Sequence, residues 1–386
     1  MTPPPRDDLP YQGLRVLDLS RVLAGPYCTA LLADLGADVV KIEPPHGDDA
    51  RHLGPFKEGE SVYFAQLNRG KRSLALDLKD PADHALLLRL AARADVVVEN
   101  FRPGVAARLG VDQETLRTRD PRLVYASISG FGQSGPLREA PAYDLVVQAM
   151  SGLMAGTGTP EGGPTRVGES LGDLVAGIFA SWAIGSALFA RERTGRGRYV
   201  DVAMFDALVA LQVTSLSLLS ATGALPGRVG NRHPVSSPFD TYPTADGSIA
   251  LAVASDGVFA RFAALVGRPG LPADPRFADD TSRTDNLAAL QEITEKWSRA
   301  RTTGTALAEA RAAGVPCAPL WDLEEALRSE QIRERGVLGT FTHPVLGPTP
   351  YLRQPVRFGT EAPTTEAAPS PGLGADRDGV LAEWLG

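Results

Sequence analysis

The first third of the chain alternates short runs rich in Val, Ile and Leu with longer helical patterns. The apolar runs stand at 15–20, 38–43, 95–100 and 122–130, and helical patterns lie between them at 25–37 and 82–94. Continuous apolar strands separated by helices predict a parallel sheet that is covered on both faces. Sheets of this kind bind ligands in the loops beyond the carboxyl ends of their strands. The loops SRVLAGP, ENFRPG and SGFGQSGP are therefore the expected places for a site.

The remainder of the chain predicts the rest of this α/β domain and a smaller one. Helical patterns follow at 143–154 and after Asp173, then a strand at 198–204 and a helix at 205–222. The Gly- and Pro-rich stretch 223–238 predicts a linker, and a smaller α/β unit follows, with strands at 248–255 and 314–321. We expect domains at 1–224 and 225–325, and a return to the large domain over 326–386. That return includes a Pro- and Ala-rich tail at 361–376 and a final helix, VLAEWL.

One acid, Asp173, opens the most apolar stretch of the chain. Leu174 to Ala190 carry no charge, and Ser170 stands three residues before Asp173. This spacing predicts a capping box at a helix N-terminus, with the acid bonding back to a free backbone N–H. The apolar run is at the short limit for a bilayer span, about 20 residues, and is rich in Gly and Ser. A tightly packed core helix is therefore expected, and no membrane segment.

Composition and missing motifs exclude several classes of protein. The net charge of −7 argues against nucleic-acid binding, and the N-terminal residues lack the apolar core of a signal peptide. Cys28 and Cys317 belong to no C-x-x-C pair, so free thiols and a cytoplasmic protein are expected. The five histidines show no metal-ligand spacing, and G-x-G-x-x-G after a strand, G-x-S-x-G and a P-loop lysine motif are absent. Acids, arginines and Gly-rich loops remain, which suits an enzyme whose nucleophile is a carboxylate.

Several motifs together resemble one enzyme family. They are LDLSRVLAGPYCTALLADLGADVVKIEPP, YFAQLNRGKRSLALDLK, ADVVVENFRPGVAARLG, YASISGFGQSGP, YDLVVQAMSGLM, GDLVAG, TGRGRYVDVAMFDA, GNRHPVSSPFDTYPTADG and GVPCAPLWDLEEAL. The chain resembles the family III CoA-transferases, also called the CaiB/BaiF or formyl-CoA transferase family. The likeness covers nearly the whole chain.

The resemblance implies that Asp173 of the G-D-x-x-x-G segment is the catalytic nucleophile. Its carboxylate would attack an acyl-CoA thioester, form an aspartyl anhydride and then an aspartyl-CoA thioester, and pass CoA to a free carboxylic acid. An Asp with a pKa of about 4 is ionised at neutral pH, so we expect it to need no general base. Backbone N–H groups of nearby glycines would stabilise the oxyanions. The CoA thioester is a co-substrate, and no tightly bound cofactor or metal is implied.

The family's CoA-binding positions carry over unevenly. Those that match are Val22, Leu23, Ala24, Leu76, Lys79, Asn100, Phe101 and Arg108. Lys79 and Arg108 are expected to meet phosphates. Basic residues of some relatives are replaced by Pro44 and Pro141, for which Arg51 or Arg138 would compensate. The glycine loop that shields the anhydride corresponds loosely to Gly230, Asn231 and Arg232.

Two other functions stay open. The racemase branch of the family needs an acid and a base, and carries a His directly before the Asp that here is Asp144. Tyr143 replaces that His, so CoA transfer is favoured, with Tyr143 and Asp144 as substrate contacts. The second alternative is a non-catalytic acyl-CoA-binding protein, and competing thioester hydrolysis is also left open.

The resemblance also implies an unusual architecture. The expected fold is α/β, with a Rossmann-like parallel sheet in the large domain and a smaller α/β domain. In the family each subunit is a ring, and two rings interlock as a homodimer. The Pro-rich tail would then wrap a partner.

Overall fold

The computed structural model describes residues 9–359 and 366–386, which form two compact units. The first unit contains the described parts of Met1–Leu153, Arg166–Val213 and Ser329–Gly386. The second contains Met154–Thr165 and Thr214–Arg328. The smaller unit therefore begins about ten residues before the expected limit at 224/225, and it includes a separate segment, 154–165, that the sequence pattern did not assign to it.

The first unit is built on a six-stranded sheet whose neighbouring strands are all parallel. In chain order the strands are β1 (Arg15–Asp18), β2 (Asp38–Glu43), β5 (Arg72–Ala75), β6 (Val96–Glu99), β7 (Val124–Ser129) and β8 (Tyr199–Ala203). Their order across the sheet is β5-β2-β1-β6-β7-β8. The chain moves outward from β1 in one direction and then in the other, so the topological switch lies between β1 and β6. Doubly wound sheets bind their ligands at this switch point.

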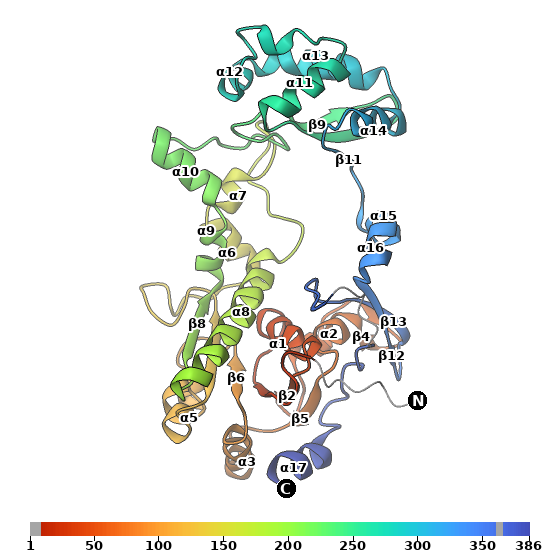
Figure 1. Ribbon diagram of the computed structural model, residues 1–386. Helices are drawn as coiled ribbons and strands as arrows, with labels where there is room; N and C mark the ends of the chain where they lie inside the picture. The colour runs from red at the N-terminus through yellow and green to blue at the C-terminus, as the bar shows by residue number, and fades with distance from the viewer. Residues whose placement is uncertain (1–8, 360–365) are drawn as a thin grey trace. The chain divides into compact units, whose positions relative to one another are not determined.

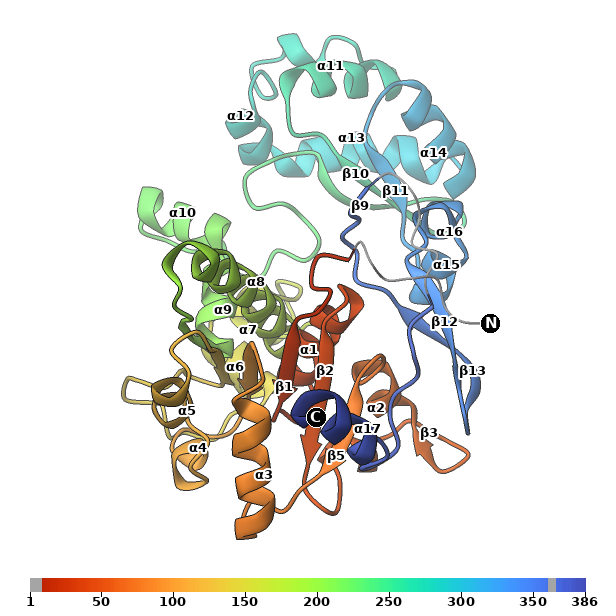
Figure 2. The same cartoon turned by 60° about the horizontal axis from the view of Figure 1, so that its bottom comes forward.

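Side chains of alternating direction build a separate core on each face of the sheet. Val16, Val96 and Val98 pack on one face, whereas Leu17 and Val97 pack on the other. The first face is covered by α1 (Ala24–Asp34), α8 (Leu171–Thr194) and α9 (Met204–Ala210). The second is covered by α3 (Pro81–Ala91), α5 (Gln113–Arg119) and α17 (Arg377–Leu385), which Figure 2 brings toward the viewer. The predicted parallel sheet with helices on both faces is confirmed (Figure 1).

Shorter elements complete the first unit. They are α2 (Val62–Leu67), α4 (Val105–Arg108), α6 (Asp144–Met150), α16 (Glu330–Arg335), and the hairpins β3 (Phe56–Lys57)–β4 (Glu60–Ser61) and β12 (Leu338–His343)–β13 (Gly347–Leu352).

The described part of the C-terminal tail, 366–376, binds its own chain. Asp376 and Ser73 exchange two hydrogen bonds, of 2.8 and 3.1 Å, and the backbone N–H of Gly374 donates to Ser73 Oγ. Pro371 O accepts a hydrogen bond from Arg51. The described tail residues therefore contact β5 and Arg51 of the first unit, and wrapping of a partner by the tail stays a prediction. The rest of the expected strap, 361–365, lies outside the described residues.

Two helices expected as single elements are broken. The pattern at 143–154 forms α6 and α7 (Leu153–Gly156), separated at Gly152, whose φ of +89° lies in the left-handed region. The pattern at 205–222 forms α9 and α10 (Val213–Thr222), which are bent by 61°. At the bend the Gln212 side chain donates to Ser151 O at 2.8 Å, and its backbone N–H bonds three residues back to Val209. Hydrophobic periodicity does not report such breaks, because both segments keep their apolar faces.

The second unit has a three-stranded antiparallel sheet in the order β11-β10-β9. The strands are β9 (Phe239–Pro243), β10 (Ser248–Ala252) and β11 (Cys317–Pro319). Besides α10, its helices include α11 (Asp256–Leu265), α12 (Asp280–Asp285), α13 (Leu287–Arg299), α14 (Thr303–Ala312) and α15 (Leu323–Arg328). Phe259, Phe262 and Trp297 are central to its core. The expectation of a smaller α/β unit is confirmed.

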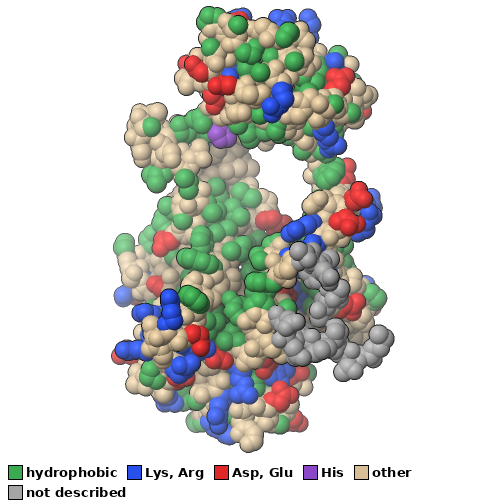
Figure 3. Space-filling view, viewed as in Figure 1, with side chains coloured by type: hydrophobic (Ala, Val, Ile, Leu, Met, Phe, Trp, Pro, Cys, Tyr) green, Lys and Arg blue, Asp and Glu red, His purple; other side chains and the backbone are tan. Residues whose placement is uncertain are grey.

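Helix α8 is long and apolar enough to cross a membrane by length and composition alone, as is the bent α9–α10 pair. One side of α8 packs in the core through Ala176, Ala180 and Ile184. The other side exposes Ile178, Trp182 and Phe189, with 48, 68 and 66% of their surface accessible. Hydrophobic side chains gather over this helix in Figure 3. Its apolar surface therefore exceeds what the first unit itself covers.

Candidate active site

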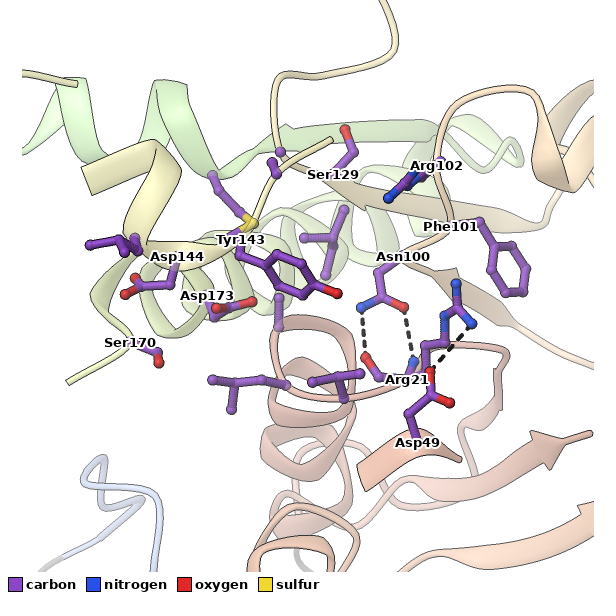
Figure 4. A pocket seen from close by; sticks show the side chains of 18 of the residues that line it. Arg21, Asp49, Asn100, Phe101, Arg102, Ser129, Tyr143, Asp144, Ser170 and Asp173 are labelled. Atoms are coloured by element: carbon purple, nitrogen blue, oxygen red, sulfur yellow. Dashed lines mark hydrogen bonds and ion pairs between the residues drawn. The ribbon is translucent and has the colours of Figure 1, made fainter. Parts of the chain in front are cut away.

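A cavity of about 540 Å³ lies in the first unit beyond the carboxyl ends of β1, β6 and β7. The loop after β1 contributes Arg21 to Ala24, and the loop after β6 contributes Asn100 to Pro103. Asp173, Asp144 and Tyr143 also line it (Figure 4). The cavity is thus at the switch point of the sheet, in the loops that the sequence pattern predicted.

Asp173 is the third residue of α8, and two glycines allow its neighbours to approach. A Cβ on Gly172 would lie 2.8 Å from the Val147 side chain of α6. A Cβ on Gly177 would lie 2.8 Å from the carbonyl oxygen of Ala24 in α1. The backbone N–H of Ala24, which lines the same cavity, lowers the pKa of the Asp173 carboxyl. The glycines of G-D-x-x-x-G therefore bring α6 and α1 against the helix that carries the acid.

The predicted capping box is wrong. The Ser170 side chain makes no capping hydrogen bond at the start of α8. Instead, the backbone N–H of Gly172 donates to Asp144 Oδ1 at 2.8 Å, and Gln148 Nε2 donates to the other oxygen of Asp144 at 2.8 Å. The cap comes from α6, so Asp173 is left to face the cavity. A cap from another helix cannot be recognised in a local spacing pattern.

The electrostatic surroundings of Asp173 also differ from the expectation. Burial and the neighbouring Asp144 carboxylate raise the pKa of Asp173 to about 7, although the Ala24 N–H opposes this. The expectation that a carboxyl with a pKa near 4 is fully ionised at neutral pH is therefore wrong for this residue. A carboxylate with a higher pKa is a stronger base and a stronger nucleophile once it is ionised.

A second cavity, of about 340 Å³, adjoins the first and shares Arg21, Asp49 and Phe101 with it. The second cavity is lined by Pro44, Leu76 and Lys79, and also by residues of β2 and α4. Arg108, at the end of α4, is exposed and lines neither cavity, although its helix neighbours Val105 and Leu109 line the second.

The first cavity brings together most of the residues singled out in the sequence. They are Val22, Leu23, Ala24, Asn100, Phe101, Tyr143, Asp144 and Asp173. Arg138 also lines it, whereas Arg51 makes two hydrogen bonds, of 2.7 and 2.8 Å, to Glu43. Arg51 is thus engaged inside the unit.

The loop residues Gly230, Asn231 and Arg232 belong to the second unit. The Gly230 N–H donates to Gly158 O at 2.9 Å, and Asn231 Nδ2 donates to Thr241 Oγ1 at 3.0 Å. Their role at the site stays a prediction.

Several lining residues were not singled out in the sequence. Arg21, Arg102 and Arg166 bring positive charge to the cavity. Tyr63 also lines it, and burial together with Asp173 raises the pKa of Tyr63 to about 12, which keeps its hydroxyl protonated. Arg21 and Arg102 stand in the two predicted loops, so loop position was a usable signal. Tyr63 and Arg166 lie far from those loops in sequence, and no local pattern marks them.

Comparisons with known proteins agree on one family. The model of the family described as "CoA-transferase family III" matches residues 11–377. The chain is 48% identical over 339 residues to an acetyl-CoA:oxalate CoA-transferase of Acetobacter aceti, which covers 87% of each chain. It is 38% identical to a succinate–glutarate CoA-transferase of Agrobacterium fabrum, over 99% of this chain and 98% of that one. A crystal structure of a CaiB/BaiF family protein from Brucella suis superimposes with a TM-score of 0.83 at 37% identity, covering 97% and 99% of the two chains.

The doubly wound sheet with an acid-bearing cavity at its switch point places the protein in the α/β class, in which ligands bind at this position. The chain belongs to CoA-transferase family III. It is therefore an enzyme that transfers CoA between an acyl-CoA and a carboxylic acid. The resemblance noted in the sequence is confirmed, and the non-catalytic alternative is set aside.

Proposed function

We propose that this enzyme moves CoA from an acyl-CoA to a short dicarboxylic acid, with Asp173 as the covalent nucleophile. The observation that carries the proposal is the position of the Asp173 carboxylate. It lines a cavity at the switch point together with Ala24 at the start of α1, and it has a raised pKa.

The reaction consists of four exchanges at carbonyl carbons. The Asp173 carboxylate attacks the thioester carbonyl, the C–S bond breaks, and CoA thiolate leaves an aspartyl anhydride. The thiolate then attacks the Asp173 carbonyl of the anhydride, which releases the donor acid and forms an aspartyl-CoA thioester. The acceptor carboxylate attacks this thioester to give a second anhydride and thiolate. Attack of the thiolate on the acceptor's carbonyl yields the new acyl-CoA and restores Asp173.

Backbone N–H groups beside Asp173 suit the negative charge that develops on oxygen. Ala24 and Gly25 begin α1, where N–H groups have no partner in the preceding turn. The helix dipole adds positive potential there. Preorganised donors of this kind typically contribute a factor of about 10²–10³ in kcat each.

We assign the nucleotide end of CoA to the second cavity and the thioester to the first. Leu76 and Phe101 supply apolar surface for the base, and Lys79 supplies a cation for a phosphate. The shared residues Arg21 and Phe101 then flank the connecting arm. Arg108 has a smaller role in this arrangement because it lines neither cavity.

A dicarboxylic acceptor is supported by charge and by the relatives. Four arginines, Arg21, Arg102, Arg138 and Arg166, line the cavity that holds Asp173. Guanidinium groups bind carboxylates in a bidentate geometry. One carboxylate of the acid would react while an arginine holds the other. The relatives' names specify oxalate, glutarate and mesaconate as acids.

Racemisation is less well supported. It needs a second proton carrier opposite Asp173. The described residues that line the cavity include no histidine, and Tyr143 is 75% exposed. Tyr63, with a pKa of about 12, is a poor base at neutral pH.

We further propose that the enzyme is a cytoplasmic homodimer whose second copy covers the exposed apolar side of α8. Isolated exposed apolar residues need no explanation, but Ile178, Trp182 and Phe189 lie on one helix face at spacings of four and seven.

Covalent trapping tests the nucleophile. The enzyme is mixed with acetyl-CoA or succinyl-CoA, quenched with hydroxylamine, and digested for peptide mass spectrometry. We expect a hydroxamate on the peptide that contains Asp173, and no adduct in Asp173→Asn, which should also lose at least about 10³-fold in transfer rate. An Asn variant that transfers CoA within tenfold of the parent would falsify the covalent mechanism. Oxalate, succinate, glutarate and acetate as acceptors then test the preference for two carboxylates.

A further inference from the structure

The loop between β1 and α1 holds a strained residue next to the nucleophile. Val22 has a φ of +67°, in the left-handed region. This conformation is strained for a β-branched residue, and it persists only where the surroundings enforce it. Two residues later, Ala24 lines the same cavity as Asp173, and its N–H lowers the pKa of that carboxyl. The conformation of Val22 therefore sets the direction of the N–H groups that follow it.

Side chains hold the polar backbone atoms on the N-terminal side of this bend. Lys41 Nζ donates to Ser20 O at 2.7 Å. Asn100 accepts from the N–H of Arg21 and donates to its carbonyl oxygen, both at 2.8 Å (Figure 4). Asp48 Oδ1 accepts from the N–H of Val22 at 3.1 Å. The loop is thus clamped on three successive residues.

Two of these clamping side chains form a buried ion pair. Lys41 Nζ lies 2.8 Å from Asp48 Oδ2, and the two side chains are 0 and 1% exposed. Asp48 is fixed in turn because its own N–H donates to Glu43 Oε2 at 3.0 Å. A charge pair this deeply buried is weak evidence for stabilisation of the fold, because desolvation offsets the attraction. Because the pair also hydrogen-bonds to Ser20 and Val22, it can hold the loop in position.

We propose that Asp48 and Lys41 are positioning residues that hold Val22 in its strained conformation, so that the Leu23 and Ala24 N–H groups face the reacting carboxylate. Neither side chain needs to touch substrate in this role. The inference rests on the proposed function, since the carboxylate concerned is the nucleophile Asp173.

Replacement of Asp48 tests the role. Asp48→Glu keeps the charge beside Lys41, but its longer side chain moves the acceptor away from the Val22 N–H. Asp48→Asn removes the charge. We expect either change to lower kcat by about 10- to 100-fold, which is less than the roughly 10²–10³-fold loss of a whole oxyanion donor, because the N–H group is displaced and not removed. Asp34→Asn is the matched control, because it breaks another buried ion pair, with Arg69, away from the loop. The control should lose stability and keep kcat.

Two further readouts separate positioning from a purely structural role. Displacing the Ala24 N–H from Asp173 raises the pKa of Asp173, whereas loss of the Asp48 charge alone lowers it. Asp144, which also acts on Asp173, is unchanged, so an upward shift of the pH–rate midpoint in Asp48→Asn reports the displaced loop. Glycine tolerates a positive φ without strain, so Asp48→Asn/Val22→Gly should regain at least about fivefold in kcat over Asp48→Asn.

The outcomes are distinguishable. If folded Asp48→Glu keeps the parent's kcat and pH midpoint, the positioning role is wrong even when the Asp173 adduct forms. If Asp48→Asn does not fold, Asp48→Glu decides, measured at equal folded fraction by circular dichroism. No rescue by Val22→Gly also overturns the proposal. A missing adduct on Asp173 in the parent overturns the proposed function itself.

Discussion

Three residues from different parts of the chain determine the surroundings of the Asp173 carboxyl. Asp144 caps α8 and adds a negative charge, the Ala24 N–H lowers the pKa of Asp173, and Gly172 leaves room for α6. The sequence identifies Asp173 through its motif, because G-D-x-x-x-G is local. The carboxyl's pKa depends on burial and on Asp144, 29 positions away, and so requires the fold.

The raised pKa predicts a pH-dependent rate. Only the ionised Asp173 can attack, so kcat/KM for acyl-CoA should rise about tenfold per pH unit below pH 7 and level off above it. Asp144→Asn keeps a cap oxygen but removes the charge, and should move the midpoint to lower pH. Asp201→Asn, an exposed acid at β8, is the control and should leave the midpoint in place. A flat profile from pH 5.5 to 8 would contradict the raised pKa.

The same pKa predicts a pH-dependent stability. Folded Asp173 keeps its proton up to about pH 7, whereas the unfolded chain loses it near pH 4. The stability that this proton contributes to the folded state is therefore fully present below pH 4 and is lost by about pH 7. The free energy of unfolding of Asp173→Asn should therefore rise relative to that of the parent by up to about 3 kcal/mol between pH 5 and 8, since one pKa unit corresponds to about 1.4 kcal/mol. Urea unfolding at each pH measures the difference.

Asp112→Asn provides the control for this stability series. Hydrogen bonds from Thr115 outweigh burial and lower the pKa of Asp112, so this acid is ionised in both states over the range. The difference in unfolding free energy between Asp112→Asn and the parent should be constant between pH 5 and 8. A constant difference for Asp173→Asn as well would mean that its carboxyl is not perturbed by folding.

At the scale of elements, the sequence predicts the sheet better than the helices. The strands around β1 and β6 are continuous apolar runs, buried on both sides, and such runs survive in the fold with small changes at their ends. The helix break at Gly152 coincides with a left-handed backbone conformation, and the one at Gln212 with a hydrogen bond to Ser151 O; both were missed because neither changes the apolar periodicity. The close packing of α1 on α8 was not predicted either, although Gly177 carried the signal for it.

Gly177→Ala tests this packing. The added Cβ would lie 2.8 Å from Ala24 O, which is backbone and cannot move aside alone. We expect a loss of about 1–3 kcal/mol in unfolding free energy, despite the better helix propensity of Ala, and a lower kcat because α1 is displaced from Asp173. Ser186→Ala, on the exposed side of α8, is the control and should keep both values. Unchanged stability and kcat in Gly177→Ala would show that α1 is free to shift.

At the scale of the whole molecule, the first unit alone contains both cavities and all the residues that we assign to the covalent chemistry. Composition and alternating patterns predicted its class of fold. They do not report association, because a buried helix and an interface helix have the same apolar composition. The exposed side of α8 became visible only when the core was known.

Association through this surface predicts a dimer in sedimentation experiments at micromolar concentration. Trp182→Glu places a charge in the centre of the exposed apolar side of α8, and should shift the enzyme toward monomer. Arg89→Glu, on the exposed side of α3 at the opposite face of the sheet, is the control and should sediment like the parent. A monomeric parent, or a Trp182→Glu variant that remains dimeric, would exclude this surface as the interface.

The hydrogen bonds between the tail and Ser73 have a consequence for solubility. β5 is the last strand on its side of the sheet, and a free strand edge is a template for pairing with strands of other molecules. Asp376 hydrogen-bonds to both the N–H and the carbonyl oxygen of Ser73 on that open side. The C-terminal residues therefore block this edge from pairing with strands of other molecules. Shortening the chain past Asp376 would uncover this edge, and self-aggregation, rather than an altered active site, would be the first cost.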